Sequence, residues 1–327
     1  MVALVTALLL LLAARLGGAP AGAATGLLDG LLQRGEQARL ARAARLGEEE
    51  LLAAARKEGR VVWYAIPLPF NQAVVREFNK RYPGIRVEPV YSGGTQLLQR
   101  FRAEKERRFE AADCVSSGLT EAFPDLRERG YLARLDNLSN WARRPEWARD
   151  RKGAYFHYVN FKVGLMINTD RAPAEAAPRS LRELADPRWR REVALFDVTA
   201  GFSVPLYRYL VQELGFGFDW VRALRANEPF VAANAAQLDE AVSSGGRAVA
   251  IARDTEAKGA QAKGAPVVFR EATEGTMLHL MPVAVNAAAP HPHAARLFVN
   301  WLLADDTQAL LAKEGAGVPL LAGAGGL

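Results

Sequence analysis

Cysteine is almost missing from this 327-residue chain, which has one cysteine and four histidines. A single cysteine excludes an intramolecular disulfide, and with it the small scaffolds that disulfides hold together. The residue itself, Cys114, lies in the largely apolar stretch AADCV (111–115). We expect it to be a small buried hydrophobe rather than a redox or metal-binding group.

Motifs of the common enzyme classes are also missing. The sequence has no nucleophile elbow, no zinc-ligand spacing and no phosphate-gripping GxxxxGK[ST] loop. We therefore predict no catalytic residue, no cofactor and no metal site. The alternative of an enzyme rests on Cys114, which would then be a reactive thiol that ligand protects from alkylation.

The basic residues are not clustered apart from acidic ones, although the formal net charge is +6. Lys and Arg are interspersed with Glu, as in RFRAEKERR (100–108), which is typical of a solvated helix face. Nucleic-acid binding needs clustered cations, often with interleaved aromatic residues. Nucleic acid is therefore not an expected partner.

The clearest apolar run lies at the N-terminus, where only Thr6 interrupts Val2–Ala14. At ~1.5 Å per residue this run is too short for the ~30 Å core of a membrane. The small residues AGA (21–23) follow, so residues 1–23 are predicted to be a signal peptide. No Lys or Arg precedes the run, and a signal anchor or a buried helix are the alternatives. No cysteine follows that would carry a lipid, and we expect a periplasmic location.

Beyond this run the chain alternates between helices and strands. Residues 24–59 are a predicted helical leader with Gly59 as its C-terminal cap. The predicted strands are 60–65, 85–90, 111–115, 193–196, 230–232, 247–251 and 266–269. Helices of ordinary length are predicted between most of them, which indicates βαβ units and mostly parallel sheets covered by helices.

Two further segments are strand-like, Tyr155–Asn168 and Thr276–Val285, and the first is rich in aromatic and β-branched residues. We interpret both as crossovers between two lobes. Two helices, 293–303 and 306–314, are predicted to close the chain, with Asp305 or Asp306 as the N-cap of the second.

Four stretches carry a further signal through their order and spacing. They are LAAARKEGRVVWY (52–64), SLRELADPRWRREVALF (180–196), SGGRAVAI (244–251) and the closing passage 274–314, which contains HPHAARLF and DTQ. Together they resemble the type II periplasmic binding proteins, and in particular the extracellular solute-binding protein family 1, which includes ferric-iron, putrescine-like and phosphonate-like binders. The resemblance runs from about residue 51 to residue 320.

The resemblance implies an α/β fold of two lobes, each a mostly parallel sheet flanked by helices. Two crossover hinge strands would join the lobes and let them close around a ligand. Lobe 1 would comprise residues 60–158 and 274–327, and lobe 2 would comprise residues 159–273.

Ligands of open parallel sheets lie beyond the carboxyl ends of the strands. Several turns there carry small or hydroxyl residues at predicted helix starts, where free N–H groups and the helix dipole favour a carboxylate or phosphate. Ordinary caps and turns use the same residues. The predicted ligand contacts are Tyr64, Pro67, Gly94, Thr95, Ser116, Ser117, Tyr158, Thr199, Gly201, Phe202, Ser203, Arg253 and Asp254. Arg253 either binds an anion or pairs with an acid such as Asp254.

Ferric iron is the competing ligand. In ferric members of the family the resemblance implies an adjacent tyrosine pair after strand 247–251, but this chain has ARDT (252–255) there. Tyr207 and Tyr209 are two residues apart in a predicted helix, so their side chains diverge. Iron binding through a tyrosine pair is therefore disfavoured, and HPH (291–293) is expected to be a surface loop.

The resemblance thus implies a monomeric periplasmic protein that captures a small anionic or zwitterionic ligand. It would deliver this ligand to the membrane permease and ATPase of an ABC importer. A ligand-sensing domain coupled to a kinase, and an enzyme on the same fold, are the alternatives.

Overall fold

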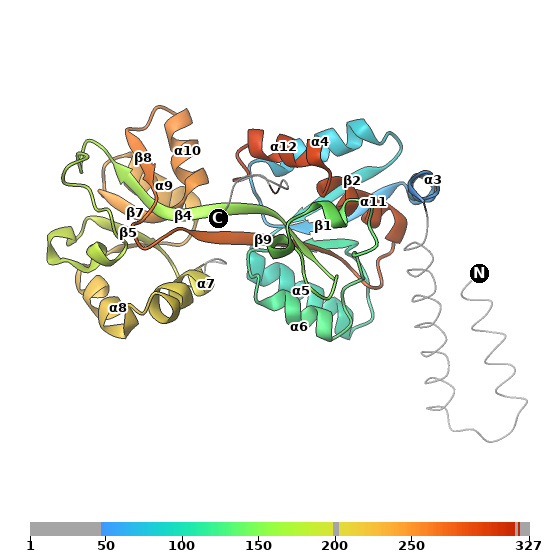
Figure 1. Ribbon diagram of the computed structural model, residues 1–327, viewed down its shortest axis with the longest axis horizontal. Helices are drawn as coiled ribbons and strands as arrows, with labels where there is room; N and C mark the ends of the chain where they lie inside the picture. The colour runs from blue at the N-terminus through green and yellow to red at the C-terminus, as the bar shows by residue number, and fades with distance from the viewer. Residues whose placement is uncertain (1–46, 199–202, 318–319, 321–327) are drawn as a thin grey trace, which may run out of the picture.

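The computed structural model describes residues 47–198, 203–317 and 320, so the predicted signal peptide and most of the predicted leader lie outside the described residues. Figure 1 shows two α/β bodies joined by two long strands, β4 (Phe156–Asn168) and β9 (Met277–Val285). We call the body that contains the helix Glu48–Glu58 lobe 1 and the other body lobe 2. The two-lobed α/β class and both crossovers are confirmed, whereas the residue boundaries between the lobes stay a prediction.

The strands of both lobes belong to one sheet. The shorter strands are β1 (Arg60–Ala65), β2 (Arg86–Tyr91), β3 (Cys114–Ser116), β5 (Val193–Phe196), β6 (Phe230–Ala232), β7 (Val249–Arg253) and β8 (Val267–Arg270). Within the described residues the order is β2-β1-β3-β9-β4-β7-β5-β6, with β8 also against β4. β1 is parallel to β2 and β3, and β5 is parallel to β6 and β7. Only the pairings that involve the crossing strands are antiparallel.

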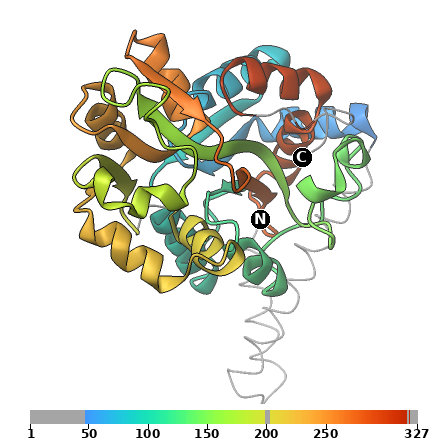
Figure 2. The ribbon, with the colours of Figure 1, turned by 60° about the vertical axis from the view of Figure 1, so that its left-hand side comes forward.

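The two crossing strands run antiparallel to each other, from the pair Phe156↔Val283 in lobe 1 to the pair Val163↔Met277 at the edge of lobe 2. Figure 2 shows them passing between the lobes with helices on both sides. The chain therefore enters and leaves lobe 2 at neighbouring positions.

Helices cover both faces of the sheet. Those of lobe 1 are α3 (Glu48–Glu58), α4 (Asn71–Arg81), α5 (Gly94–Glu106), α6 (Ala122–Glu128), α11 (Pro292–Leu302) and α12 (Asp305–Lys313). Those of lobe 2 are α7 (Ser203–Arg208), α8 (Gly217–Ala226), α9 (Ala235–Ser243) and α10 (Asp254–Ala262), and a π-helical segment, Tyr209–Glu213, continues α7. Among these helices and the rest of the described chain, none has the length and apolar character that a membrane span requires.

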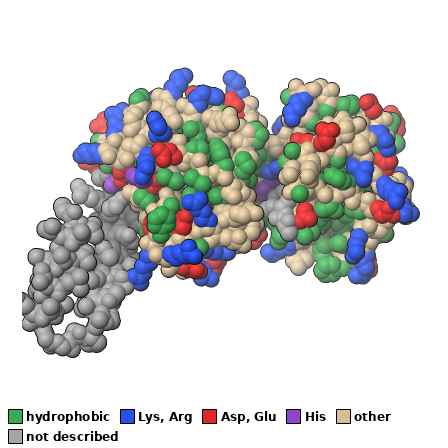
Figure 3. Space-filling model, turned by 180° about the vertical axis from the view of Figure 1, so that it is seen from behind, with side chains coloured by type: hydrophobic (Ala, Val, Ile, Leu, Met, Phe, Trp, Pro, Cys, Tyr) green, Lys and Arg blue, Asp and Glu red, His purple; other side chains and the backbone are tan. Residues whose placement is uncertain are grey.

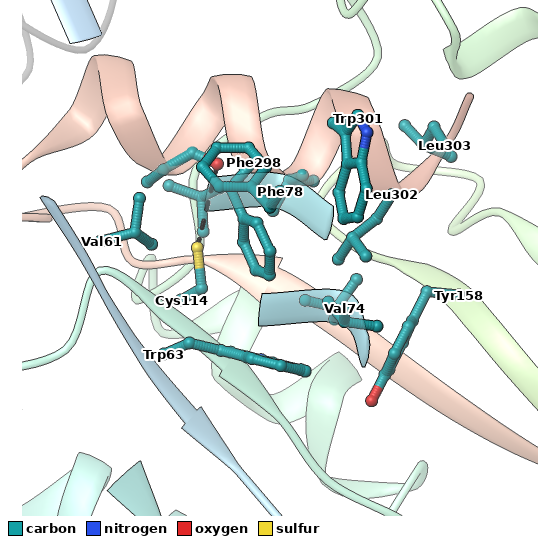
Figure 4. Close-up of a cluster of buried hydrophobic side chains, with 14 of the residues drawn as sticks. Val61, Trp63, Val74, Phe78, Cys114, Tyr158, Phe298, Trp301, Leu302 and Leu303 are labelled. Carbon is teal, nitrogen blue, oxygen red and sulfur yellow. Dashed lines mark hydrogen bonds between the residues drawn. The ribbon is translucent and has the colours of Figure 1, made fainter. Parts of the chain in front are cut away.

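The single cysteine, Cys114, lies in the hydrophobic core of lobe 1. Trp63 packs edge-on against Phe298 and Tyr158, with ring centroids 5.3 and 6.2 Å apart. Cys114 lies in the same cluster, fully buried below α11 (Figure 4). Burial raises the pKa of its thiol well above the usual value, and the neighbouring Asp113 raises it further. The expectation of a small buried hydrophobe is confirmed.

The caps of two helices, α3 and α12, can be compared with the caps that the sequence predicted. Gly59 caps α3 in the left-handed conformation (φ +74°), as predicted. The N-cap of α12 is Ala304 rather than Asp305 or Asp306, because Asp305 lies in the first turn and pairs with Arg143 and Arg144.

The HPH motif is not a surface loop, because it begins α11 and both of its imidazoles face carboxylates. His291 Nδ1 lies 2.9 Å from Asp113, and His293 Nδ1 lies 2.6 Å from Glu58 at the end of α3. The motif therefore joins α11 to the first helix and to the approach to β3.

Candidate ligand-binding groove

A groove separates the two lobes on the face shown in Figure 3. The carboxyl ends of the strands approach β4 and β9 beside it. Phe70, after β1, packs against Phe161 of β4 with ring centroids 6.3 Å apart. Gly118, after β3, accepts a hydrogen bond of 3.1 Å from Nε2 of His279 on β9. The turns after β1 and β3 therefore lie against the two crossing strands, at the carboxyl ends where ligands of such sheets bind.

Three turns of lobe 1 meet at Gly94. A Cβ added there would lie 2.7 Å from Ser117 Oγ and 3.7 Å from Ile66 Cγ2, so the close approach requires glycine. α5 begins at this point, with no side-chain cap and no acidic residue in its first turn. The first N–H groups of α5 and its positive dipole end are thus not neutralised by a side-chain cap, and Thr95 beside them is exposed.

The two predicted serines are buried and already hydrogen-bonded within the protein. Ser116 Oγ accepts a hydrogen bond from Nε1 of Trp63 (3.1 Å) and lies 3.4 Å from the carbonyl of Tyr64. Ser117 Oγ accepts a bond of 3.2 Å from the N–H of Leu119. Both side chains therefore shape the turn after β3, and a direct contact with ligand stays a prediction.

The predicted aromatic walls are core residues in this conformation. Tyr64 donates a 2.7 Å hydrogen bond to Glu104 of α5, and the guanidinium of Arg100 lies 4.8 Å from its ring centroid. Tyr158 packs on Trp63, and burial raises the pKa of its hydroxyl. Pro67, in contrast, is exposed in the turn after β1.

His279 lies between the groove-side turn of lobe 1 and the crossing strands. It is the cross-strand partner of Phe161, and a Cβ at Gly118 would lie 3.0 Å from its ring. Burial lowers the pKa of His279 to about 3, and the positive charge of Arg253 also lowers it. The imidazole is therefore neutral at physiological pH and positions the turn after β3.

Arg253 ends β7 in lobe 2, opposite Val163 of β4. Its guanidinium lies 5.1 Å from the ring centroid of Phe161 and hydrogen-bonds the carboxylate of Glu256, with Nε at 2.8 Å. The same carboxylate accepts the backbone N–H of Arg253 at 2.7 Å, which completes a capping box. Of the two expectations for Arg253, the structure contains the ion pair, but with Glu256 rather than Asp254.

The start of α10 carries two acids of the chain itself, Asp254 and Glu256. Asp254 accepts the N–H of Lys162 (3.2 Å) and the ammonium of Lys258 (2.7 Å). A third acid, Asp239 of α9, is near enough to Glu256 for that charge to raise its pKa, with burial as the larger cause; together they raise it to about 6. This helix start is therefore already compensated by negative charge.

The turn after β5 also contains predicted ligand contacts, and of these the structure describes only Ser203. Ser203 is a fully buried first residue of α7. The predicted contacts Thr199, Gly201 and Phe202 lie outside the described residues. Their proposed role stays a prediction.

Tyr207 lies in α7, and Tyr209 lies two residues later at the start of the π-helical continuation. Burial and the charge of Asp197 raise the pKa of Tyr207 to about 12, whereas burial and the charges of Glu213 and Glu274 raise the pKa of Tyr209. Within the part of the chain that the structure describes, no group of three or more His, Cys, Asp or Glu side chains is arranged to hold a metal ion.

Sequence reasoning missed Glu256, Phe161 and His279. An acid three residues after the N-cap of a helix is the signature of a capping box, so the pairing of Glu256 with Arg253 could have been predicted from the sequence. The other two lie inside the predicted crossovers, but their meeting with Arg253 and Gly118 depends on strand register, which the sequence alone did not give.

Comparison with known proteins agrees with this architecture. Residues 111–324 match the family model described as "Bacterial extracellular solute-binding protein". The chain belongs to this bacterial extracellular solute-binding protein family.

Individual relatives include proteins with different named ligands. "Iron uptake protein A1" of Synechocystis sp. is 25% identical over 256 residues, which are 73% of this chain and 70% of that protein. The structure of iron-bound HitA from Pseudomonas aeruginosa is 20% identical and has a TM-score of 0.72, covering 81% of this chain and 87% of HitA. The periplasmic binding protein AfuA from Actinobacillus pleuropneumoniae, solved with fructose-6-phosphate, is 21% identical with a TM-score of 0.69, covering 80% of this chain and 85% of AfuA. The two structures show a shared fold.

Proposed function

We propose that this protein is the solute-capturing subunit of a bacterial ABC importer, without catalytic activity of its own. It binds a small anionic or zwitterionic solute in the groove and presents it to a membrane permease that an ATPase drives. The family, the two lobes and the pair of crossing strands support a hinge that closes around ligand. The burial and raised thiol pKa of Cys114 do not favour the enzymatic alternative.

The observation that carries the choice of ligand is the start of α5. It combines an acid-free first turn with the close approach of Gly94 to Ser117 at the edge of the groove. A helix start contributes ~0.3–1 kcal/mol to an exposed anion and up to ~2 kcal/mol when partly buried. Micromolar affinity needs ~8 kcal/mol, so further hydrogen bonds and closure of lobe 2 must supply most of the binding free energy.

The charge of lobe 2 constrains the other end of the ligand. Asp254, Glu256 and Asp239 surround Arg253, and the fork of Arg253 is engaged by Glu256. A second anionic group facing this wall would be repelled. The ligand we propose therefore directs its carboxylate or phosphate towards lobe 1 and a neutral or cationic part towards lobe 2.

Ferric iron is the second candidate, because two of the relatives above are named for iron. Tyr207 and Tyr209 are two residues apart in α7 and its continuation, so helix geometry directs their side chains apart, and their charged neighbours differ; both points argue against a site formed by this pair.

A thermal-shift panel tests both candidates. The purified chain is stripped of bound solute and heated with inorganic phosphate, 2-aminoethylphosphonate, glutamate, citrate, spermidine, sucrose or ferric citrate. A solute at 100 times its Kd adds about 2.7 kcal/mol of stability, which shifts the melting temperature measurably. We expect stabilisation by a member of the phosphonate, carboxylate or amino-acid group. Stabilisation by spermidine alone, or by ferric citrate but not citrate, would overturn the proposed ligand class.

A further inference from the structure

A surface hollow on lobe 1 contains charged and aromatic groups that solute capture does not use. Its volume is 870 Å³, and its lining residues are Trp141, Glu146, Trp147, Arg149, Asp150 and Arg151. It lies beside the start of β4, because Arg149 forms a backbone bridge with Phe156. This is the end of β4 that lies within lobe 1, away from the junction with lobe 2.

The hollow has two arginines whose side chains have no ion pair within the described chain, Arg149 and Arg151. The Nε of Arg149 is buried without a hydrogen-bond partner among the described residues. The nearby Asp150 does not compensate them, because its carboxylate binds Arg127 and the N–H of Ala154 (3.0 Å). A planar guanidinium group without an ion pair favours an oxyanion such as a phosphate, because it can donate two parallel hydrogen bonds to two of its oxygens.

Trp147 adds an exposed indole to the same hollow, with 43% of its surface accessible. An amphipathic ring flanked by cations is typical of surfaces that rest on a membrane, where the ring lies at headgroup level and the cations contact phosphates. Glu146 is exposed and opposes this attraction, and the neighbouring Lys152 is paired with Glu128 at 3.6 Å.

We propose that this hollow binds the phosphate headgroup of an anionic phospholipid, so that lobe 1 rests on a membrane surface through Trp147, Arg149 and Arg151. Charge complementarity selects the phosphate. An exposed indole beside these two guanidinium groups suits a phosphate held at the level of the ring, as at a membrane surface. The proposal does not depend on which solute the groove binds.

Vesicle co-sedimentation of the full chain tests the proposal at low salt, with phosphatidylglycerol vesicles compared with phosphatidylcholine vesicles. Each cation near an anionic surface is worth about a fivefold change in partitioning. Arg149→Gln/Arg151→Gln should therefore bind phosphatidylglycerol about thirtyfold more weakly. Trp147→Ala should weaken it several-fold, and Glu146→Gln should strengthen it about fivefold.

The matched control is Arg107→Gln/Arg225→Gln, which removes two exposed arginines elsewhere on lobes 1 and 2. All variants keep the same N-terminal residues, so contributions of the apolar run at 2–14 cancel, and unchanged thermal unfolding confirms that each variant is folded. The control should bind as the unaltered chain does.

Several outcomes would overturn the proposal. One is equal loss in the control, which would indicate general charge attraction. Another is equal binding to phosphatidylcholine. A third is titratable binding of glycerol 1-phosphate that requires both Arg149 and Arg151 while phosphatidylglycerol vesicles do not bind, which would assign the hollow to a free phosphomonoester. Binding only to vesicles that contain membrane proteins would assign it to a protein partner.

Discussion

The helices α5 of lobe 1 and α10 of lobe 2 begin at corresponding places in the fold, but their first turns differ in charge. In lobe 1, α5 starts with glycines and exposed Thr95, and its first turn has no acid. In lobe 2, α10 starts with Asp254 and Glu256, and Glu256 binds both the backbone and the side chain of Arg253. Both starts lie at the carboxyl end of a strand, but of the two only the start of α10 carries acids of the chain itself.

This contrast shows that position in the fold does not decide whether a helix start binds an anion. A capping carboxylate satisfies the same N–H groups and the same dipole that a ligand would. The proposed function assigns the anion-binding wall to lobe 1 and, to lobe 2, a wall that limits the charge of the ligand. Three variants test this division.

The largest effect is expected for Arg253→Ala in lobe 2. The side chains of Arg253 and Glu256 are 11% and 5% exposed, so the variant leaves a buried carboxylate without its cation. Loss of one partner of a buried pair costs on the order of 3 kcal/mol. We expect this decrease in the free energy of unfolding, measured by urea denaturation.

Arg253→Lys is the control for that variant, because it keeps the charge but loses the fork that grips the carboxylate. It should lose about half as much stability. Hydrogen exchange should show the loss within 249–263. Equal stability of the unaltered chain and Arg253→Ala would contradict the assigned role of the pair.

A smaller effect is expected when lobe 1 is made to resemble lobe 2. Thr95→Glu places an acid in the first turn of α5, where it should stabilise the helix but repel a bound anion. Affinity for inorganic phosphate, measured by calorimetry, should fall about tenfold, which corresponds to ~1.4 kcal/mol. Gln99→Glu adds the same charge to an exposed position one turn later and should change the affinity much less. Similar losses of phosphate affinity in both variants would contradict the proposal that the start of α5 binds the anion.

The smallest effect is expected at Asp239. Its pKa is about 6 in the folded protein, because of burial and the charge of Glu256, and ~3.9 in an unfolded chain. The folded state therefore binds a proton more tightly, and the stability that this gives below pH ~4 is lost as the pH rises through 6. Because the side chain is only partly buried, we expect Asp239→Asn to stabilise the protein at pH 7 by ~1 kcal/mol.

Urea unfolding at pH 5 and pH 7 measures this difference. The variant should lose less stability than the unaltered chain between the two values. Glu240→Gln, at an exposed neighbouring position, should leave the pH dependence unchanged. A pH dependence that persists in Asp239→Asn would place the responsible group elsewhere.

Local sequence patterns predicted most of the fold. The alternation of short β-branched strands with amphipathic helices gave the α/β class, and the long strand-like segments gave β4 and β9. The small residues at 93–95 and 116–118 marked turns that do meet, because parallel strands bring their carboxyl ends together.

The chemistry of the site was less predictable. In a strand that is buried on both faces, alternation does not distinguish a core side chain from a groove side chain. Tyr64 was therefore predicted to contact ligand; its hydroxyl binds Glu104 in the structure, and a contact with ligand stays a prediction. The contact between His279 and Gly118 joins residues 161 positions apart, and it follows from the pairing of β3 with β9 rather than from either local sequence.

The pairing of Val163 with Met277 has a consequence for how proteins of this shape diversify. Lobe 2 is topologically an insertion into lobe 1, with its two ends held side by side on adjacent strands. Such a module can be exchanged between relatives by replacing one contiguous segment, without breaking the core in which Trp63, Cys114 and Phe298 pack. Chimeras cut at these two positions would keep the start of α5 from one parent and take the start of α10 from another.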